Sequence, residues 1–541
     1  MVKNIILCSD GTGNSGGKGR GTNVWRLFKA LDLNPVPDNP GKNVQYAMHD
    51  DGVGTSDFKL FKIFGGALGF GLKRNIRQLY IFLCRIYDPG DQIFIFGFSR
   101  GAYTARALAG LISQCGIIDA KKHSDKQLTY IVNQSINILR RNFRRKVFEQ
   151  LRGKDWIIKH EQEVKTLAEN FRKQYSVFHP VHVPDRRPEI SFLGVWDTVD
   201  AYGLPWDGLT DFVHYCIYPF KFPDRQLSSK VLKAAQAISI DDERHTFHPE
   251  LWEETDADKE RINQVWFAGV HSNVGGGYPK EGMAYVTLDW MMTQVEHAID
   301  QKHQGLHFIK HKREEIRLGA NVFDKQYDSR AGLMVYYRYK PRDIGEICKR
   351  NNIDIPKIHV SALYRTAQHI DNYAPGNFPI RIKVISTEHQ PGIPDISIEK
   401  LQPLENAFAK ANNDKTLLNK VKTGIVVRRF LHHALIAVTI FLFYFAHHSS
   451  TYCPAIDQAG HWIEKIKGIF TVLPFAGDWV FQNMIKPLFV CPDFGIFIIG
   501  ILLIIWLLGH LIKNWMNREF KKFWDRVFEE LGLRKSELNK Q

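Results

Sequence analysis

The chain has 541 residues, of which 44% are hydrophobic and 24% charged, so its composition excludes a wholly disordered protein. Basic residues outnumber acidic ones by 72 to 57, and the net charge of +15 favours anionic partners. No nucleic-acid-binding motif is evident, so we expect lipid headgroups as that partner and no nucleic acid. The cysteines show no pair at CxxC spacing within residues 1–400, and we therefore expect no structural metal site.

The first 120 residues alternate strand-like and helix-like segments. Short apolar runs at Asn4–Cys8 and Gln92–Phe98 predict buried strands, and Ala102–Leu111 predicts a helix of small and apolar residues. Residues 120–185 are polar and basic with helical patches, and we interpret them as a helical insertion. The first residues carry no long apolar run, so we expect no secretory signal peptide.

Two more buried-strand runs follow the insertion. Ile190–Trp196 ends at Asp197, and Ile262–Val270 ends at His271. Continuous apolar runs separated by helical stretches are typical of a mostly parallel sheet that is covered on both faces. The sequence therefore predicts an α/β fold, with residues 1–400 as its main domain.

The composition changes in the C-terminal part. We expect a linker at 401–429, a membrane hairpin at 430–512 with apolar segments 434–446 and 494–512, and a basic amphipathic tail helix at 513–541. A spanning helix needs about 20 apolar residues. The second segment satisfies that length. The first is short, so it is interpreted either as a span that recruits its neighbours or as a buried or interfacial helix.

Charge around the hairpin predicts its orientation. Basic residues flank both apolar segments, whereas the loop between them is more acidic. The positive-inside rule then places the main domain on the cytoplasmic side of a multi-pass membrane protein. Cys453 and Cys491 in the loop either pair in an oxidising compartment or stay free. The tail helix lies either in the membrane interface or against another part of the protein or a second copy.

The strongest motif is Gly97-Phe98-Ser99-Arg100-Gly101, which fits G-x-S-x-G. It directly follows a predicted strand and directly precedes a predicted helix. A nucleophile elbow requires this context, because the flanking glycines permit the sharp turn. The N–H at Arg100 and the helix dipole then face an oxyanion. We therefore predict that Ser99 is a nucleophile.

A serine nucleophile needs a base and an acid that orients it. Asp197 and His271 end successive predicted strands and follow Ser99 in the order Ser, Asp, His that α/β-hydrolases use. The carboxyl ends of parallel strands gather such groups at one edge. Asp200 is a rival for the acid. The rival bases are His245 and His248, which stand in a charged segment.

The Gly-rich loop after the first strand supplies a second group of candidates. Its backbone at Gly11 and Thr12 is expected to give the second oxyanion N–H, with Asp10 as a hydrogen-bonding support. The spacing around Lys18 does not fit a phosphate-binding P-loop. This chemistry requires no metal and no cofactor.

Four motifs in order resemble one known family. They are SDGTGN near the N-terminus, GFSRGAYTAR, GVWDTVDAYG and GVHSNVGGGY, and together with weaker segments they extend over residues 1–390. They are similar to the catalytic domain of type VI secretion phospholipase effectors of the first Tle class. That domain was long described as a domain of unknown function. The resemblance implies an α/β-hydrolase fold with helical insertions. We expect the C-terminal transmembrane segment in addition to that fold.

The resemblance implies that Ser99, Asp197 and His271 form the triad and that the substrate is a membrane glycerophospholipid ester. A lipid would then be both substrate and anchor. It also implies a secretion-machinery or immunity-protein partner, and secretion into target cells if the chain is an effector toxin. Two alternatives stay open: a membrane-anchored esterase of soluble substrates, and a non-catalytic membrane or interaction module on a hydrolase scaffold.

Overall fold

The computed structural model describes residues 2–11, 21–34, 42–50, 68–177, 187–200, 225–297, 304–379, 381–387, 406–407, 410, 415–452 and 492–532. Within these ranges the chain forms two compact units. The first comprises Met1–Ser329, Pro341–Ala411 and Trp524–Gln541, and the second comprises Arg330–Lys340 and Asn412–Phe523.

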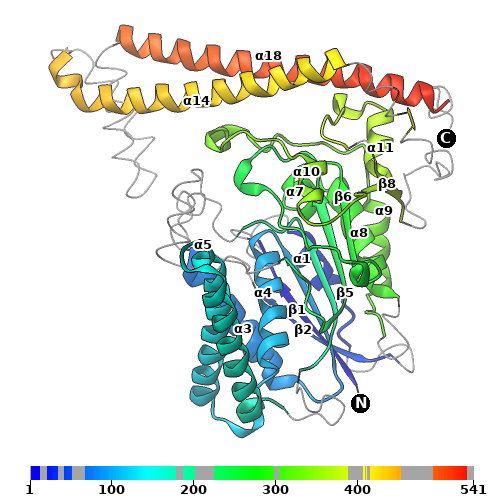
Figure 1. Ribbon diagram of the computed structural model, residues 1–541. Helices are drawn as coiled ribbons and strands as arrows, with labels where there is room; N and C mark the ends of the chain where they lie inside the picture. Colours follow the sequence, from blue (N-terminus) through cyan, green and yellow to red (C-terminus); the bar gives the residue numbers. More distant parts are fainter. Residues whose placement is uncertain are drawn as a thin grey trace, which may run out of the picture. The chain divides into compact units, whose positions relative to one another are not determined.

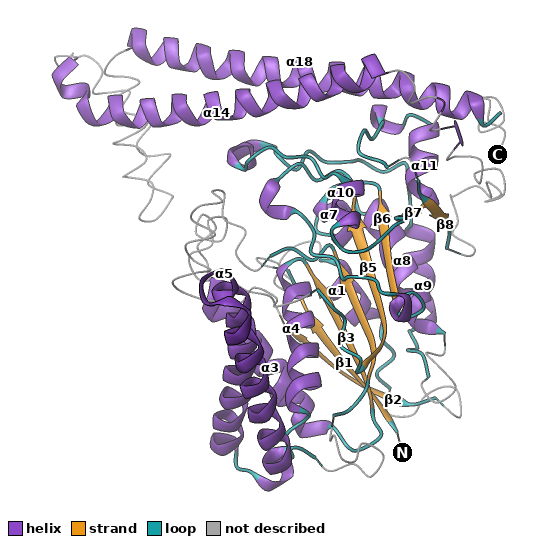
Figure 2. Ribbon diagram, in the orientation of Figure 1, coloured by secondary structure: helices purple, strands orange, loops and turns teal. Residues whose placement is uncertain are grey.

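The first unit is built on a sheet whose strands are drawn in orange in Figure 2. The sheet has eight strands in the order β2-β1-β3-β4-β5-β6-β7-β8, and all neighbouring strands are parallel. This confirms the predicted α/β class. The strands are β1 (Lys3–Ser9), β2 (Val44–Asp50), β3 (Gln92–Phe98), β4 (Ile190–Trp196), β5 (Val231–Ser239), β6 (Ile262–Phe267), β7 (Lys357–His359) and β8 (Lys383–Ile385).

Helices cover both faces of the sheet (Figure 1). A hydrophobic core lies beneath the helices on each face. In β1, Ile5 belongs to the core under α3, α4 and α5, whereas Ile6 belongs to the core under α1, α8 and α9. Alternate side chains therefore enter opposite cores, which explains the continuous apolar runs. The helices of this unit are α1 (Asn23–Ala30), α3 (Leu68–Ile86), α4 (Arg100–Cys115), α5 (Asp125–Tyr175), α7 (His271–Gly275), α8 (Gly282–Glu296), α9 (Lys310–Gly319), α10 (Ile344–Lys349) and α11 (Val360–Ala367).

The range predicted as a helical insertion contains α5. The His160 ring nitrogen lies 2.8 Å from the Arg141 carbonyl oxygen. In a straight helix, 19 residues would separate these groups by about 28 Å. The two halves of α5 therefore fold back on each other. Its N-terminus has a capping box, in which Ser124 and Gln127 satisfy each other's backbone N–H groups.

The second unit contains η5 (Gly332–Tyr336), α14 (Lys415–Tyr452) and most of α18 (Pro492–Glu530). Arg428 of α14 donates a hydrogen bond to the Tyr339 hydroxyl at 2.9 Å and lies 4.0 Å from the centre of that ring. Two stretches, Thr423–Leu442 and Ile496–Glu530, are long and apolar enough to cross a membrane by length and composition.

Both C-terminal helices differ in extent from the sequence prediction. Helix α14 begins at Lys415, inside the predicted linker. It continues to Tyr452, and no proline interrupts it. Helix α18 continues from the apolar segment into the predicted tail, so the tail is not a separate helix. Cys453, Cys491 and the loop that joins the two helices lie outside the described residues.

The end of α18 packs within the first unit. Trp524 and Val527 are fully buried, and the Trp524 indole N–H donates to the Pro375 carbonyl at 2.8 Å. His369 lies 2.8 Å from the Asp525 carboxylate. Of the two interpretations left open for the tail, docking on another part of the protein therefore applies to residues 524–528.

Candidate active site

Ser99 stands at the sharp turn between β3 and α4. Its backbone has φ 60° and ψ −123°, a conformation that is rare for a residue with a side chain and marks local strain. A Cβ on Gly97 would collide with the Gly101 carbonyl oxygen, and a Cβ on Gly101 would collide with the Ser9 carbonyl oxygen. Both glycines of the motif are therefore required for the turn to pack against β1.

His271 bridges Ser99 and Asp197. Its Nε2 lies 2.7 Å from the Ser99 hydroxyl oxygen, and its Nδ1 lies 2.6 Å from Asp197 Oδ2. Ser99 follows β3, Asp197 follows β4 and His271 follows β6. The carboxyl ends of these parallel strands lie at one edge of the sheet. Ser99 is 8% exposed, His271 4% and Asp197 0%. The structure thus brings together the three side chains that the sequence singled out.

The Asp197 carboxylate is held by more than the histidine. It accepts hydrogen bonds from the Ser239 backbone N–H at 2.9 Å and from the Ser239 hydroxyl at 3.2 Å. Arg342 donates to both of its oxygens, at 2.7 and 2.9 Å. Burial alone would raise the pKa of Asp197, but the Arg342 charge and the hydrogen bond from His271 hold that pKa well below its usual range. Asp197 is therefore a fixed carboxylate.

The surroundings of His271 favour a neutral imidazole. Burial lowers its pKa from the usual 6.5, against the opposing effect of Asp197. The ring is held between two aromatic side chains, with centroid distances of 4.7 Å to Phe98 and 5.1 Å to Phe247. Such packing fixes the imidazole plane, so its two nitrogens address the serine and the aspartate at once.

The Gly-rich loop after β1 approaches the same edge. Asp10 accepts hydrogen bonds from the Gly11 N–H at 2.6 Å and from the Thr22 hydroxyl at 2.8 Å. Asp10 therefore ties the two ends of the loop together, and the Gly11 N–H is occupied by its carboxylate in this conformation. Thr12 lies outside the described residues. Arg100 is the first residue of α4, so its backbone N–H lies in the N-terminal turn of that helix.

The rival residues stand elsewhere. Asp200 follows Asp197 by three positions, but the histidine contact is made by Asp197. His245 and His248 pack edge to face against each other, with ring centres 5.3 Å apart. The short helix η3 (His245–Phe247) places the Phe247 ring against the imidazole of His271.

Sequence reasoning missed Arg342 and Ser239. Ser239 ends β5, whose sequence VLKAAQAIS has no pattern that distinguishes it from a helix. Arg342 stands in the irregular stretch between Tyr339 and α10, more than 140 residues from Asp197, and no motif surrounds it. Only the fold reveals that either residue contacts the aspartate.

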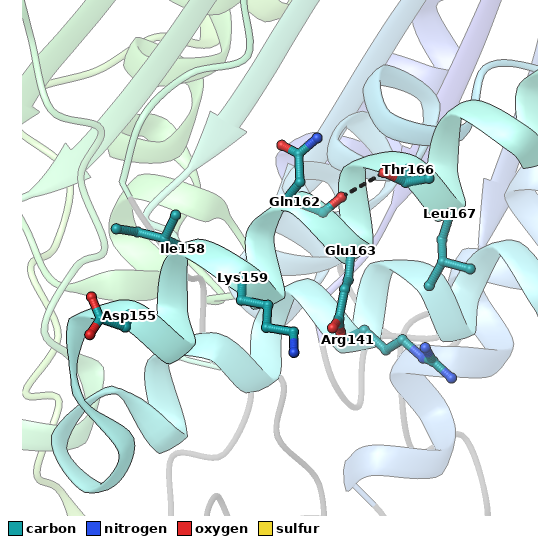
Figure 3. A pocket seen from close by; sticks show the side chains of 8 residues that line it. All are labelled: Arg141, Asp155, Ile158, Lys159, Gln162, Glu163, Thr166 and Leu167. Atoms are coloured by element: carbon teal, nitrogen blue, oxygen red, sulfur yellow. Dashed lines mark hydrogen bonds between the residues drawn. The ribbon is translucent and has the colours of Figure 1, made fainter.

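No metal site coincides with this triad in the described part of the chain. No group of three or more His, Cys, Asp or Glu side chains there is arranged to hold a metal ion. A surface hollow of about 760 Å³ lies on α5 (Figure 3). None of the residues that line it belongs to the triad. The residues lining it are Arg141, Asp155, Ile158, Lys159, Gln162, Glu163, Thr166 and Leu167.

Comparisons with known proteins identify a family, a sequence relative and a solved structure to which this chain is similar. The model of the family described as "T6SS, Phospholipase effector Tle1-like, catalytic domain" matches residues 3–294. An uncharacterized protein of Saccharomyces cerevisiae is 29% identical over 262 residues, which cover 45% of this chain and 32% of that protein. The match thus spans about a third of the yeast relative. A crystal structure of an uncharacterized protein from Pseudomonas aeruginosa shares 16% identity at a TM-score of 0.34, over 76% of this chain and 59% of that one.

Proposed function

The chain belongs to the family of Tle1-like catalytic domains of type VI secretion system phospholipase effectors, and from this membership we propose that it is a serine hydrolase of membrane glycerophospholipids. The bond cleaved is a carboxylic ester, and the reaction passes through an acyl-enzyme. One observation carries the proposal: a continuous chain of short contacts runs from the Ser99 hydroxyl through His271 to Asp197.

The chemistry follows from that chain of contacts. Neutral His271 Nε2 accepts the proton of the Ser99 hydroxyl as the oxygen attacks the ester carbonyl carbon. The tetrahedral intermediate collapses when the imidazolium returns the proton to the leaving lysophospholipid oxygen. Water, deprotonated by the same imidazole, then attacks the acyl carbon of the acyl-enzyme. The imidazolium returns that proton to the Ser99 oxygen as its bond to the acyl carbon breaks and the fatty acid is released. Asp197 remains ionised throughout and stabilises the imidazolium.

The oxyanion of each tetrahedral intermediate needs N–H donors close to Ser99. The Arg100 N–H is one donor, because it stands at the positive end of α4 directly after the nucleophile. We assign the second donor to the loop at Gly11 and Thr12. For Gly11 this requires its N–H to leave the Asp10 carboxylate when substrate binds.

The apolar helices support a lipid substrate. Within the stretch 496–511 of α18, nine large apolar side chains are exposed by 42–71%, while Ile498 is buried. Soluble proteins rarely expose a continuous apolar surface of this kind, whereas a bilayer would cover it. We therefore propose that α14 and α18 attach the enzyme to a membrane, which keeps its substrate at a high local concentration. Secretion as an effector toxin and recognition by an immunity protein extend the proposal on the family name alone.

The proposal is tested by offering two substrates to the full-length protein. Mixed phospholipid vesicles and a short-chain soluble ester are incubated with wild type and with Ser99→Ala, and products are identified by mass spectrometry. We expect fatty acid and lysophospholipid from vesicles with wild type alone. Hydrolysis of the soluble ester without any phospholipid cleavage would refute the lipid substrate. Full activity of Ser99→Ala would refute the mechanism.

A further inference from the structure

Arg342 is a fully buried arginine whose guanidinium lies behind the acid of the triad. Its side chain is 0% exposed, and it pairs with both oxygens of Asp197, which is also 0% exposed. A two-pronged contact of this kind fixes the plane of a carboxylate as well as its charge state. Residues 3–294, which carry the family match, do not include it.

Each terminal nitrogen of the Arg342 guanidinium also donates to a second group near His271. One donates to the carbonyl oxygen of Ser239, whose own N–H and hydroxyl hold Asp197. Another donates to the carbonyl oxygen of Phe247, whose ring packs against the imidazole. A single side chain therefore links the acid that contacts Nδ1 and the aromatic wall that fixes the ring plane.

Asp197 has particular need of such support. Its backbone has φ 39°, in the left-handed region that residues with side chains avoid. The carboxylate must therefore be aimed at His271 from a strained position. Without Arg342, the Asp197 oxygens would keep Ser239 and His271 as donors but lose their buried counter-charge.

We propose that Arg342 is a positioning residue for the reaction at Ser99: it holds Asp197 in line with His271 Nδ1 and balances the negative charge of that carboxylate. This inference rests on the proposed serine-hydrolase function. Arg342 touches neither substrate nor Ser99, so its effect is transmitted through Asp197.

The charges around His271 give the proposal a distinctive signature. Among the described residues, three charged side chains act on the imidazole: Asp197, Asp242 and Arg244. Asp242 accepts the His271 backbone N–H at 3.3 Å and pairs with Arg244 at 2.7 Å. With Arg342 in place, two carboxylates are matched by two guanidinium groups. Removing Arg342 leaves one net negative charge, which favours the imidazolium and raises the pKa of His271.

The experiment compares full-length wild type with Arg342→Met and Arg342→Lys, measuring the rate at which a fluorophosphonate labels Ser99 between pH 4 and pH 9. Above its pKa His271 is the neutral base, so labelling rises with pH. The pH range over which labelling rises is the acid limb of this profile. We expect Arg342→Met to shift the acid limb to higher pH by about one unit. Its rate at high pH should fall about 10²-fold, through misplacement of the imidazole. Arg342→Lys should restore the position of the limb, but not the full rate.

Arg365→Met is the matched control. Arg365 is also 0% exposed and bonds to the Val322 and Asp324 carbonyl oxygens and to Asp371, none of which belongs to the triad. It should lose stability without moving the acid limb. An acid limb of Arg342→Met that coincides with wild type would overturn the positioning role. The positioning role would also be overturned if the acid limb of Arg342→Lys lay at the same pH as that of Arg342→Met. If wild type is labelled yet cleaves no phospholipid, only the lipid substrate fails, and the same profiles still decide the role of Arg342.

Discussion

Replacing Gly101 by alanine should destabilise the protein, although the same change in the middle of a helix normally stabilises it. The new Cβ would overlap the carbonyl oxygens of Ser9 and Asp10 and lie 2.6 Å from the Asp10 carbonyl carbon. These are backbone atoms at the end of β1, which is paired on both sides. They have little freedom to move away, so the clash falls on the helix and on the turn at Ser99.

The magnitude is the balance of two opposing effects. Alanine gains about 0.5–1 kcal/mol over glycine within a helix. Overpacking costs about 1–3 kcal/mol, and a rigid backbone obstacle places this site at the upper end. The net loss in the free energy of unfolding is therefore about 2 kcal/mol for Gly101→Ala. Ser99 labelling by a fluorophosphonate should fall with it, because the turn is displaced.

Gly110 in the same helix is the matched control. A Cβ there would meet only Leu139 Cδ1, at an ordinary contact distance of 3.7 Å. Gly110→Ala should therefore gain about 0.5–1 kcal/mol. Urea unfolding of the two variants in mild detergent, monitored by circular dichroism, gives both values. A Gly101→Ala protein as stable as wild type or as Gly110→Ala would refute this account of the elbow.

The other predictions concern the triad and the C-terminal helices. Asp197→Asn should lower turnover about 10⁴-fold, the loss seen when an amide misorients the histidine, in an assay of vesicle hydrolysis with circular dichroism as the folding control. Because burial lowers the pKa of His271 below 6.5 and only its neutral form is a base, activity should stay high through pH 6.5 and fall at lower pH; half-maximal activity above pH 7 would contradict this. Trp524→Ala should cost about 3–5 kcal/mol of unfolding free energy. Trp524→Phe should cost less, since it loses mainly the hydrogen bond to Pro375. Leu507→Arg should weaken co-sedimentation with vesicles, because an arginine at the centre of a span costs about 2.5–3.5 kcal/mol; unchanged sedimentation would exclude α18 as an anchor.

Half of the sheet could be predicted from sequence, for a clear physical reason. The strands β1, β3, β4 and β6 lie inside the sheet and are almost wholly buried, and most of their residues are apolar. Strand β2 is at the edge and only half-buried, so its sequence VQYAMHD mixes polar and apolar residues. The strands β7 and β8 have three residues each, too few for any periodicity.

Strand β5 shows where local preference fails. Its residues VLKAAQAIS include alanine, lysine and glutamine, which favour helices, yet pairing with β4 and β6 holds them extended. The tertiary context therefore overrides local propensity in β5. Because this strand was not predicted, the position of Ser239 at its end was not predicted either.

The candidate site divides in the same way. Ser99 and Asp197 were predictable because each directly follows a recognisable strand, and the carboxyl ends of parallel strands converge. His271 was found in the same way, although β6 ends at Phe267 and not at the predicted Val270. Arg342 and Ser239 had no such marker, since their importance arises from contacts between segments far apart in the chain. The extent of α18 was also missed, because a change from apolar to amphipathic composition does not end a helix.

Covalent labelling of wild type and His271→Ala with a fluorophosphonate, followed by peptide mapping, tests the central claim most directly. If His271 activates Ser99, the adduct should form on Ser99 in wild type and be reduced by several orders of magnitude in the variant. Equal labelling without the histidine, or an adduct on another residue, would contradict the claim that these side chains act together.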